Sequence, residues 1–249
     1  MVPLSVITVV KNNAFGLRKT LESAQSQDFL DWELLIVYSP SNDETFEVAS
    51  EFCQSDHRIH LIEQKGQGIY DAMNLGISES SSEFLWFMNS GDQFYSSNAL
   101  TSGLNKIMNS RSGFVVGGYK IENDQRIFKQ KAGRLSKLRF SLSRRGACHQ
   151  AMIFRKEAIQ NSGSFDLNFR LAADYKLCLQ IINTFGASKV DDIFANMEPN
   201  GLSDRNLREM HTEKRAVRRE IFDKNLPARA LGWLWMQAAW AKAALRHLS

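Results

Sequence analysis

Along the first third of the chain, short apolar runs alternate with segments whose apolar residues recur every three or four positions. An uninterrupted apolar run is typical of a parallel strand buried on both faces, and the wider spacing is typical of the buried side of a helix. Strands separated by helices predict βαβ units and a parallel sheet. The expected strands are 4–10, 33–37, 59–62 and 84–88, and the helices between them are 16–27, 43–52 and 69–77.

The pattern becomes less regular after residue 95, where strands and helices no longer alternate strictly. A stretch between residues 129 and 145 is basic, with little acid to balance it. The whole pattern predicts an α/β protein in which a regular first half precedes an irregular second half. The expected later elements are helix 97–108, a hairpin of strands 114–119 and 126–130, strand 150–154, helices 172–184 and 203–224, and a last helix from Pro227.

Composition adds a mild positive charge and no sign of a structural metal or of disulfides. The 249 residues suffice for one large domain or for a domain with an appendage. The formal net charge of +4 is compatible with anionic substrates or a membrane surface, but it is too small to indicate nucleic-acid binding. The three cysteines form no Cys-x-x-Cys pair, so neither a zinc site nor a disulfide framework is expected.

We expect no signal peptide and no membrane span. The N-terminal apolar run lacks a basic segment before it and is short, which suits a first strand. The longest uncharged apolar stretch near the C-terminus, 230–241, is far shorter than the roughly 20 residues that a span needs. The expectation is therefore a cytoplasmic protein, soluble or peripheral at the inner face of the cytoplasmic membrane.

The C-terminal segment 228–249 has two interpretations. Trp233, Trp235 and Trp240 stand among alanines and leucines, with basic residues toward both ends. This pattern is typical of a helix that lies in a membrane interface. A helix packed on the domain, or on another subunit, explains the pattern equally well.

The fourth expected strand ends on the polar residues Asn89-Ser90-Gly91-Asp92. Open α/β sheets bind ligands at the carboxyl ends of their strands, and Mg²⁺ prefers oxygen ligands and often bridges to substrate phosphates. Asp92 offers a carboxylate, Asn89 a neutral oxygen, and Gly91 a backbone that can approach a ligand closely. The alternative is a plain β-turn, for which the same four residues are suitable.

Five segments, in the right order, resemble the family 2 glycosyltransferases, which have the GT-A fold. The resemblance covers roughly residues 3–203, and each segment is weak by itself. Within the family, GIYDAMN and NSGD look most like the enzymes that build bacterial exopolysaccharides such as colanic acid. The five segments are LSVITVVKNN, WELLIVYSPSNDET, GIYDAMNLGI, FLWFMNSGD and HQAMIFRKEAIQNSGSFDLNFRLAADYKLCLQI.

The resemblance implies that a sugar moves, with inversion, from a nucleotide-diphosphate donor to a saccharide or polyprenyl-linked acceptor. A UDP-sugar is the expected donor, and Mg²⁺ or Mn²⁺ is the implied cofactor. Asp92 matches the metal ligand of the family, and Asp174 matches its catalytic base. The implied parts are a GT-A domain at 1–203, with a nucleotide-binding half at 1–95 and an acceptor half at 96–203, and a C-terminal helical extension at 204–249.

Six positions match donor-side contacts of the family, and most of them also have a simpler explanation. Thr8 more often packs than binds, and Tyr38 stands where the family usually has paired acids that read uracil, so it would stack on the base instead. Asp71 and Asn74, one helical turn apart, could meet the ribose or donor sugar, or serve as capping and surface residues. His149 could contact donor phosphate or acceptor, or be a structural histidine. The implied donor-binding residues are Thr8, Tyr38, Asp71, Asn74, Asn89 and His149.

Departures from the family pattern keep a second function open. The acidic motif holds Asp92 alone where relatives have more than one acid, and Lys176 and Gln180 stand in a helix that often ends in Arg-Trp. The alternative is a non-catalytic sugar-nucleotide-binding or scaffold subunit of a polysaccharide assembly. A nucleotidyltransferase is a weaker candidate, because a phosphate loop rich in glycine and lysine is missing near the first strand.

Overall fold

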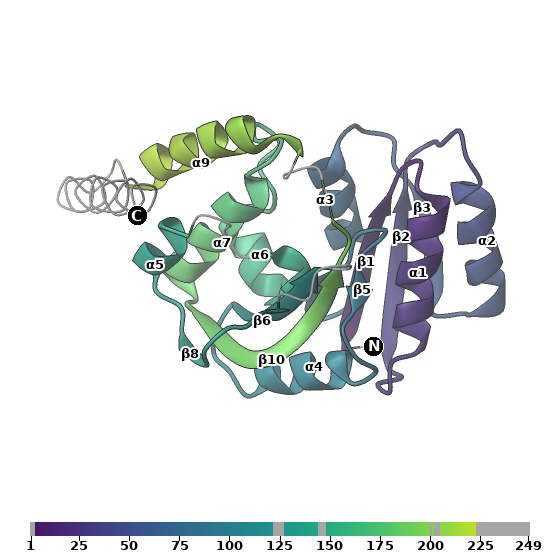
Figure 1. Cartoon of the computed structure of the whole chain (residues 1–249), viewed down its shortest axis with the longest axis horizontal. Helices are drawn as coiled ribbons and strands as arrows, with labels where there is room; N and C mark the ends of the chain where they lie inside the picture. Colours follow the sequence, from purple (N-terminus) through teal and green to yellow (C-terminus); the bar gives the residue numbers. More distant parts are fainter. Residues whose placement is uncertain (1–2, 122–126, 144–147, 200, 202–204, 223–249) are drawn as a thin grey trace, which may run out of the picture.

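A mixed β-sheet runs through the computed structural model, which describes residues 3–121, 127–143, 148–199, 201 and 205–222 (Figure 1). The strand order is β3-β2-β1-β4-β9-β6-β10-β5, with β7 paired to β6 and β8 paired to β10. The first four strands are parallel, whereas β9 runs antiparallel to both of its neighbours. The strands are β1 (Leu4–Val10), β2 (Trp32–Tyr38), β3 (Ile59–Glu63), β4 (Phe84–Phe87), β5 (Gln93–Phe94), β6 (Phe114–Ile121), β7 (Ile127–Phe128), β8 (Gly133–Arg134), β9 (Met152–Arg155) and β10 (Ala187–Met197).

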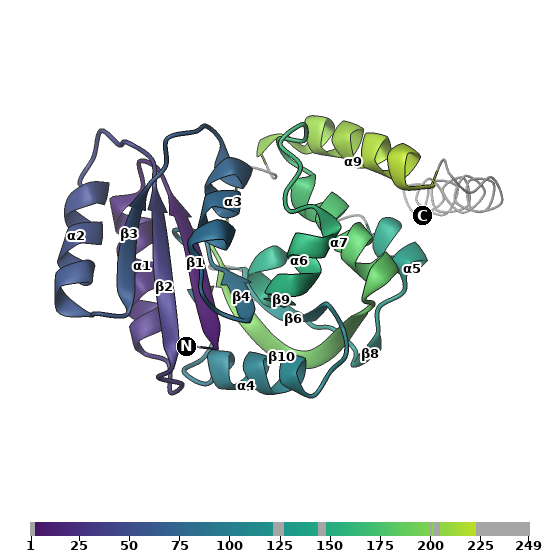
Figure 2. The same ribbon diagram turned by 180° about the vertical axis from the view of Figure 1, so that it is seen from behind.

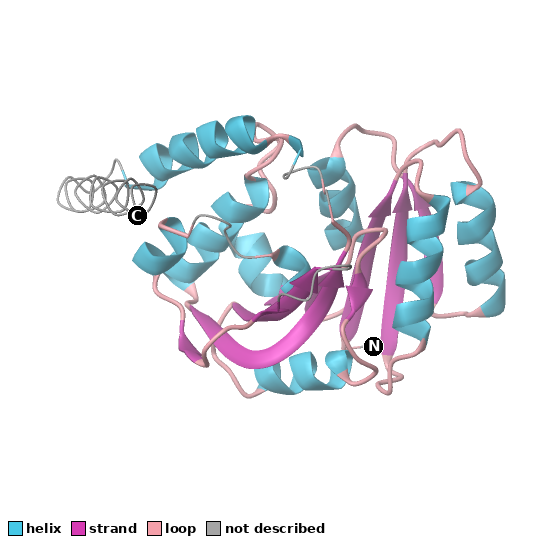
Figure 3. Cartoon of the chain, viewed as in Figure 1, coloured by secondary structure: helices cyan, strands magenta, loops and turns pink. Residues whose placement is uncertain are grey.

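Helices cover both faces of this sheet, so the strands have apolar side chains on each side (Figures 2 and 3). One hydrophobic core lies between the sheet and helices α1, α2 and α4, and the other lies between the sheet and helices α3, α6 and α7. The helices are α1 (Ala14–Gln25), α2 (Thr45–Ser55), α3 (Ile69–Glu79), α4 (Ala99–Met108), α5 (Lys137–Ser141), the 3₁₀ helix η1 (His149–Ala151), α6 (Lys156–Ser162), α7 (Ala173–Thr184) and α9 (Leu207–Phe222).

The elements expected in the first half are confirmed. Every strand and helix expected before residue 95 is present, with small shifts at its ends, and the four expected strands pair in parallel. The hairpin expected at 114–119 and 126–130 is also present, as the antiparallel pair of β6 and β7. The strand expected at 150–154 begins later, because residues 149–151 form η1.

The pattern of apolar residues did not indicate β10, the longest strand. Its sequence, ASKVDDIFANM, carries two adjacent aspartates, and its pairing with β6 shifts register twice. Each register shift interrupts the alternation of buried and exposed side chains by which a strand is recognised. β5 and β8, at two residues each, are too short to produce any pattern.

The sequence led to two expectations about membranes, namely that no helix spans one and that the segment 228–249 could lie in a membrane interface. No helix among the described residues is both long enough and apolar enough to cross a membrane. The interface helix predicted at 228–249 lies outside the described residues.

Gly76 sets how closely α3 approaches the sheet. A Cβ atom at this position would lie 2.5 Å from Cγ2 of Ile7, which is fully buried in β1. Because Ile7 is β-branched and enclosed, we expect Gly76→Ala to lower the free energy of unfolding by about 1–3 kcal/mol through overpacking. The helix propensity gained from alanine, about 1 kcal/mol, offsets only part of this cost.

Urea unfolding of Gly76→Ala checks this expectation against Ser78→Ala, an exposed position on the same helix. The control should change the free energy of unfolding by less than about 0.5 kcal/mol. Equal stability of the two variants would contradict the close packing.

Candidate active site

A pocket of about 1600 Å³ lies where the carboxyl ends of β1 and β4 meet the second half of the protein. Its walls come from the ends of β1, β4 and β10, the loop before α3, η1, the start of α7, and α9. The predicted residues Asn89, Asp92, His149 and Asp174 all line it. These four residues come from three segments far apart in the sequence, and the fold brings them to one cavity.

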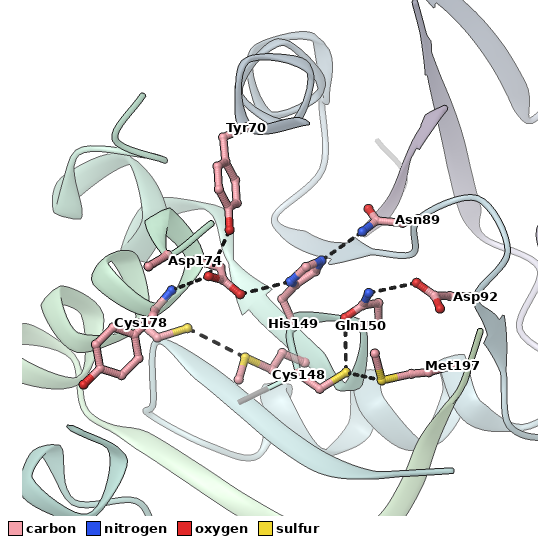
Figure 4. A network of polar contacts seen from close by, with 12 residues as sticks. Tyr70, Asn89, Asp92, Cys148, His149, Gln150, Asp174, Cys178 and Met197 are labelled. Atoms are coloured by element: carbon pink, nitrogen blue, oxygen red, sulfur yellow. Dashed lines mark hydrogen bonds and ion pairs between the residues drawn. The ribbon is translucent and has the colours of Figure 1, made fainter. Parts of the chain in front are cut away.

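Asp174, in the first turn of α7, is the centre of a hydrogen-bond network (Figure 4). Its Oδ1 accepts hydrogen bonds from the Tyr70 hydroxyl at 3.0 Å and from the backbone N–H of Tyr175 at 2.7 Å. Its Oδ2 lies 3.3 Å from Nδ1 of His149. Burial by itself raises the pKa of Asp174, but hydrogen bonding from His149 and the charge of Lys214 hold that pKa below its ordinary value. The carboxylate is therefore ionised at neutral pH.

Tyr70 and His149 both act as hydrogen-bond donors to this carboxylate. Burial, together with the charge of Asp174, raises the pKa of the Tyr70 phenol well above its usual value, so the hydroxyl keeps its proton. On the other side of the imidazole ring, Nε2 of His149 lies 3.1 Å from the amide nitrogen of Asn89. With the Asn89 amide in this orientation, Nε2 must accept, which leaves Nδ1 to carry the proton and donate to Asp174.

The position of η1, which carries His149, follows from contacts with β4 and the loop after it. The indole N–H of Trp86 donates to the carbonyl of Gln150 at 2.8 Å, and the Gln150 side chain donates to Asp92 at 2.8 Å. The Cys148 thiol donates to the amide oxygen of Gln150 at 3.1 Å, which orients that amide with its nitrogen toward Asp92. Burial raises the pKa of the Cys148 thiol, so it remains a donor.

Asp92 is 6% exposed and is held from two sides. Its Oδ2 accepts from Gln150, and its Oδ1 accepts from the backbone N–H of Glu198, at the end of β10, at 2.9 Å. Burial raises the pKa of Asp92 to about 6, although both hydrogen bonds oppose the rise. The loop is held to α1 by Thr20, whose hydroxyl donates to the Asp92 carbonyl at 2.7 Å and accepts from the Gly91 N–H at 3.0 Å.

Glu198 brings a second carboxylate to the Asp92 loop. Gly91 has a φ of 101°, and a Cβ atom there would overlap the Glu198 carboxyl group. The side-chain oxygen of Asn89, close to this loop, is buried without a hydrogen-bond partner among the described residues. A second acid, from the residue that follows β10, therefore lies beside the Asp92 loop, and no local sequence signal indicated it.

These oxygens fit a divalent cation that also binds substrate phosphates. The described residues contain no group of three or more histidines, cysteines or acids arranged to hold a metal by themselves. Mg²⁺ commonly takes only one or two protein carboxylates and completes its shell with substrate phosphates and water. Asp92 and Glu198, with the Asn89 amide oxygen, meet that requirement.

The other predicted donor residues lie outside the pocket lining. Thr8 is fully buried in β1, and its hydroxyl has no hydrogen-bond partner among the described residues. The Tyr38 hydroxyl accepts from the backbone N–H of Ser41 at 3.1 Å, and its ring packs on Phe46. The pocket is lined instead by the residues that follow these positions, at 9–13 and 39–40.

Asp71 and Asn74 do not line the pocket, but they form hydrogen bonds that hold neighbouring residues in place. Asp71 accepts from the side chain of Gln64 at 2.9 Å, which holds the loop 64–68 against the start of α3. Asn74 bonds both the N–H and the carbonyl of Phe165 at 2.9 Å, and the Phe165 ring stacks on Tyr70. Within the GIYDAMN motif, Tyr70 is the residue that reaches Asp174, although the sequence alone did not predict a role for it.

Helix α9 fixes the start of α7. The Glu213 carboxylate accepts from the backbone N–H groups of residues 170, 171 and 172 at 2.8–3.0 Å, immediately before α7 begins. The buried Lys176 pairs with Asp166 and with Glu220 of α9, each at 2.5 Å. Lys176, which departs from the family pattern, therefore ties α9 to the helix that carries Asp174.

Comparison with known proteins identifies the same protein family as the sequence motifs do. Residues 5–164 match the family described as Glycosyl transferase family 2. The chain belongs to this family. A PGL/p-HBAD biosynthesis glycosyltransferase of Mycobacterium bovis is 30% identical over 172 residues, which are 69% of this chain and 66% of that relative. The match thus spans slightly under two thirds of the relative's length.

Solved structures confirm the GT-A fold predicted for this family member. TarS from S. aureus has a TM-score of 0.71 at 19% identity, covering 90% of this chain and 40% of that one. A mannosyltransferase from Pyrobaculum calidifontis, in complex with GDP-Man and Mn²⁺, has a TM-score of 0.65 at 15% identity, covering 99% of this chain and 80% of that one. At such low identity the likeness shows the fold alone.

Removal of the Glu213 carboxylate should loosen the start of α7. Glu213→Ala leaves three backbone N–H groups without their acceptor, so we expect the free energy of unfolding to fall by about 2–3 kcal/mol. Glu209→Ala, on an exposed position of the same helix, is the matched control and should have little effect. Urea unfolding measures both variants. The capping role would be refuted by equal stability of Glu213→Ala and the control.

Proposed function

We propose that this chain is an inverting glycosyltransferase that moves a sugar from a UDP-sugar to a saccharide or lipid-linked saccharide acceptor in bacterial surface polysaccharide synthesis. The observation that carries the proposal is the ionised Asp174 carboxylate, held by Tyr70 and His149 in the same pocket as the Asp92 loop. Support also comes from TarS 1-349, solved in complex with UDP-GlcNAc, which has a TM-score of 0.70.

In this mechanism Asp174 acts as the general base. Tyr70 and the Tyr175 N–H occupy Oδ1, whereas Oδ2 accepts only from His149 among the described residues. Oδ2 therefore keeps a lone pair for the proton of the acceptor hydroxyl. The acceptor oxygen bonds to the anomeric carbon as the bond to the donor phosphate breaks on the opposite side, and the hydroxyl proton passes to Asp174.

The Asp92 loop would receive the leaving diphosphate. Asp92, with Glu198 and Asn89 beside it, would hold a Mg²⁺ or Mn²⁺ ion, which would supply positive charge against the negative charge that develops on the leaving group. His149 connects the two sides of the pocket, since it bonds Asn89 through one ring nitrogen and Asp174 through the other. Its role is to orient the base relative to the donor side.

Asp174→Asn tests the catalytic role directly. The amide keeps the shape of the side chain but cannot accept the proton, so we expect kcat to fall by about 10²–10⁴-fold. Binding of UDP with Mn²⁺, measured by calorimetry, should stay within twofold of wild type. Asp191→Asn, an exposed position on β10, is the control and should keep full activity.

Two results would argue against this function. Wild-type protein that binds UDP but shows no turnover with any nucleotide sugar would favour the non-catalytic binding subunit instead. Wild-type protein that binds no nucleotide would refute both functions.

Asp92→Asn tests the donor side. Loss of the carboxylate should weaken Mn²⁺ binding in the presence of UDP by at least about tenfold, because a charged oxygen ligand is removed. Electron paramagnetic resonance of free Mn²⁺ gives this readout without depending on activity. Unchanged Mn²⁺ affinity, in a variant whose melting temperature matches wild type, would exclude Asp92 as a ligand.

A further inference from the structure

Lys214 is a buried lysine on the wall that α9 contributes to the pocket. It is 4% exposed and lines the pocket. Its ammonium group has no hydrogen bond or ion pair within the described part of the chain, and it lies 5.3 Å from the centroid of the Tyr175 ring. Lys176, which is about equally buried, instead has two carboxylates within 2.5 Å. Because a desolvated charge without a counter-ion is unfavourable, this arrangement favours an anionic ligand.

Among the residues that the structure describes, no acid forms an ion pair with Lys214. Asp174 is close enough to influence it electrostatically but is not within ion-pair distance. Glu213, the preceding residue, is engaged by three backbone N–H groups at the start of α7. Arg170 and Arg205 line the same wall, which makes it basic apart from Asp174.

The position of Lys214 indicates that its anionic ligand belongs to the acceptor substrate and not to the donor. This step rests on the function proposed above, in which Asp174 removes the proton from the acceptor hydroxyl. The donor diphosphate leaves from the opposite side of the anomeric carbon, toward the Asp92 loop. Lys214 lies on the Asp174 side of the pocket. An anionic group bound there is therefore different from the donor diphosphate.

We propose that Lys214 binds a phosphate group of the acceptor, with Arg170 beside it. The acceptor substrate is then a phosphorylated molecule rather than a neutral sugar. A phosphate in a sugar-phosphate or polyol-phosphate chain and a phosphate that links a saccharide to a lipid present the same chemistry to Lys214. Leu207 and Met210 of α9 also line the pocket and offer apolar surface to a lipid.

The test measures glycerol 3-phosphate binding to the full chain by calorimetry, with UDP and Mn²⁺ saturating the donor side and again without them. We expect saturable binding to wild type, at least about tenfold weaker binding to Lys214→Met, and retained binding to Lys214→Arg, since arginine also pairs with phosphate. Arg215→Met, which removes the same charge from an exposed position of α9, is the matched control and should bind as wild type does.

A second titration, with farnesyl phosphate, distinguishes the sources of the phosphate. Binding at least about tenfold tighter than that of glycerol 3-phosphate, and lost in Lys214→Met, identifies a lipid-linked phosphate, because burial of the apolar chain adds affinity. Equal affinities identify a phosphate carried on a saccharide or polyol.

Three results would overturn the proposal. If wild type binds neither phosphate compound, there is no phosphate-binding site. If Lys214→Met binds both compounds as tightly as wild type does, Lys214 is not part of such a site. A Lys214→Met variant that binds phosphate normally but shows a shifted pH profile of kcat would show that Lys214 acts only through Asp174. Failure of the proposed function is separate, because it shows as absent UDP binding or turnover, whereas phosphate binding is also measured without nucleotide.

Discussion

The arrangement of the second half depends on keeping one partly buried carboxylate charged. Asp174 lies where burial disfavours its ionised form, and it is ionised because hydrogen-bond donors converge on it from separate elements. Tyr70 comes from α3, His149 from η1, and the Tyr175 N–H from the first turn of α7 itself. Each donor has to be held in place by its own surroundings, since a donor displaced by an ångström would leave the charge unsatisfied.

Those surroundings explain features that otherwise look unrelated. Phe165 stacks on Tyr70 and is clamped by Asn74, while Trp86 and Gln150 tie η1 to β4 and to the Asp92 loop. Helix α9 caps the start of α7. The same side chains that satisfy buried polar groups therefore set the distance between Asp174 and the Asp92 loop. The hydrogen bonds that support the fold and those that position Asp174 form one network.

The Asp92 loop shows how the fold can bring a second acid to a motif that contains one. Asp92 stands alone in its loop, yet the bulged strand β10 ends beside it and brings Glu198 against Gly91. The absence of a side chain at Gly91 is what makes room for that carboxyl group. Lys214 is a comparable case, because α9, which is remote in sequence, adds a buried lysine to the pocket that Asp174 lines.

The sequence by itself determined the first half of the fold, because continuous apolar runs and helical spacing are local properties of β1 to β4 and α1 to α3. It also indicated Asn89, Asp92, His149 and Asp174, which follow or begin regular elements within recognisable motifs. The tertiary structure decided which residues support them. Thr8 and Tyr38 sit just short of the pocket, Asn74 acts through Phe165, and Tyr70 takes the position facing Asp174. Glu198, Glu213 and Lys214 gain their roles only when β10 and α9 pack against the first half. Such contacts depend on distances between segments far apart in the chain, which no local periodicity records.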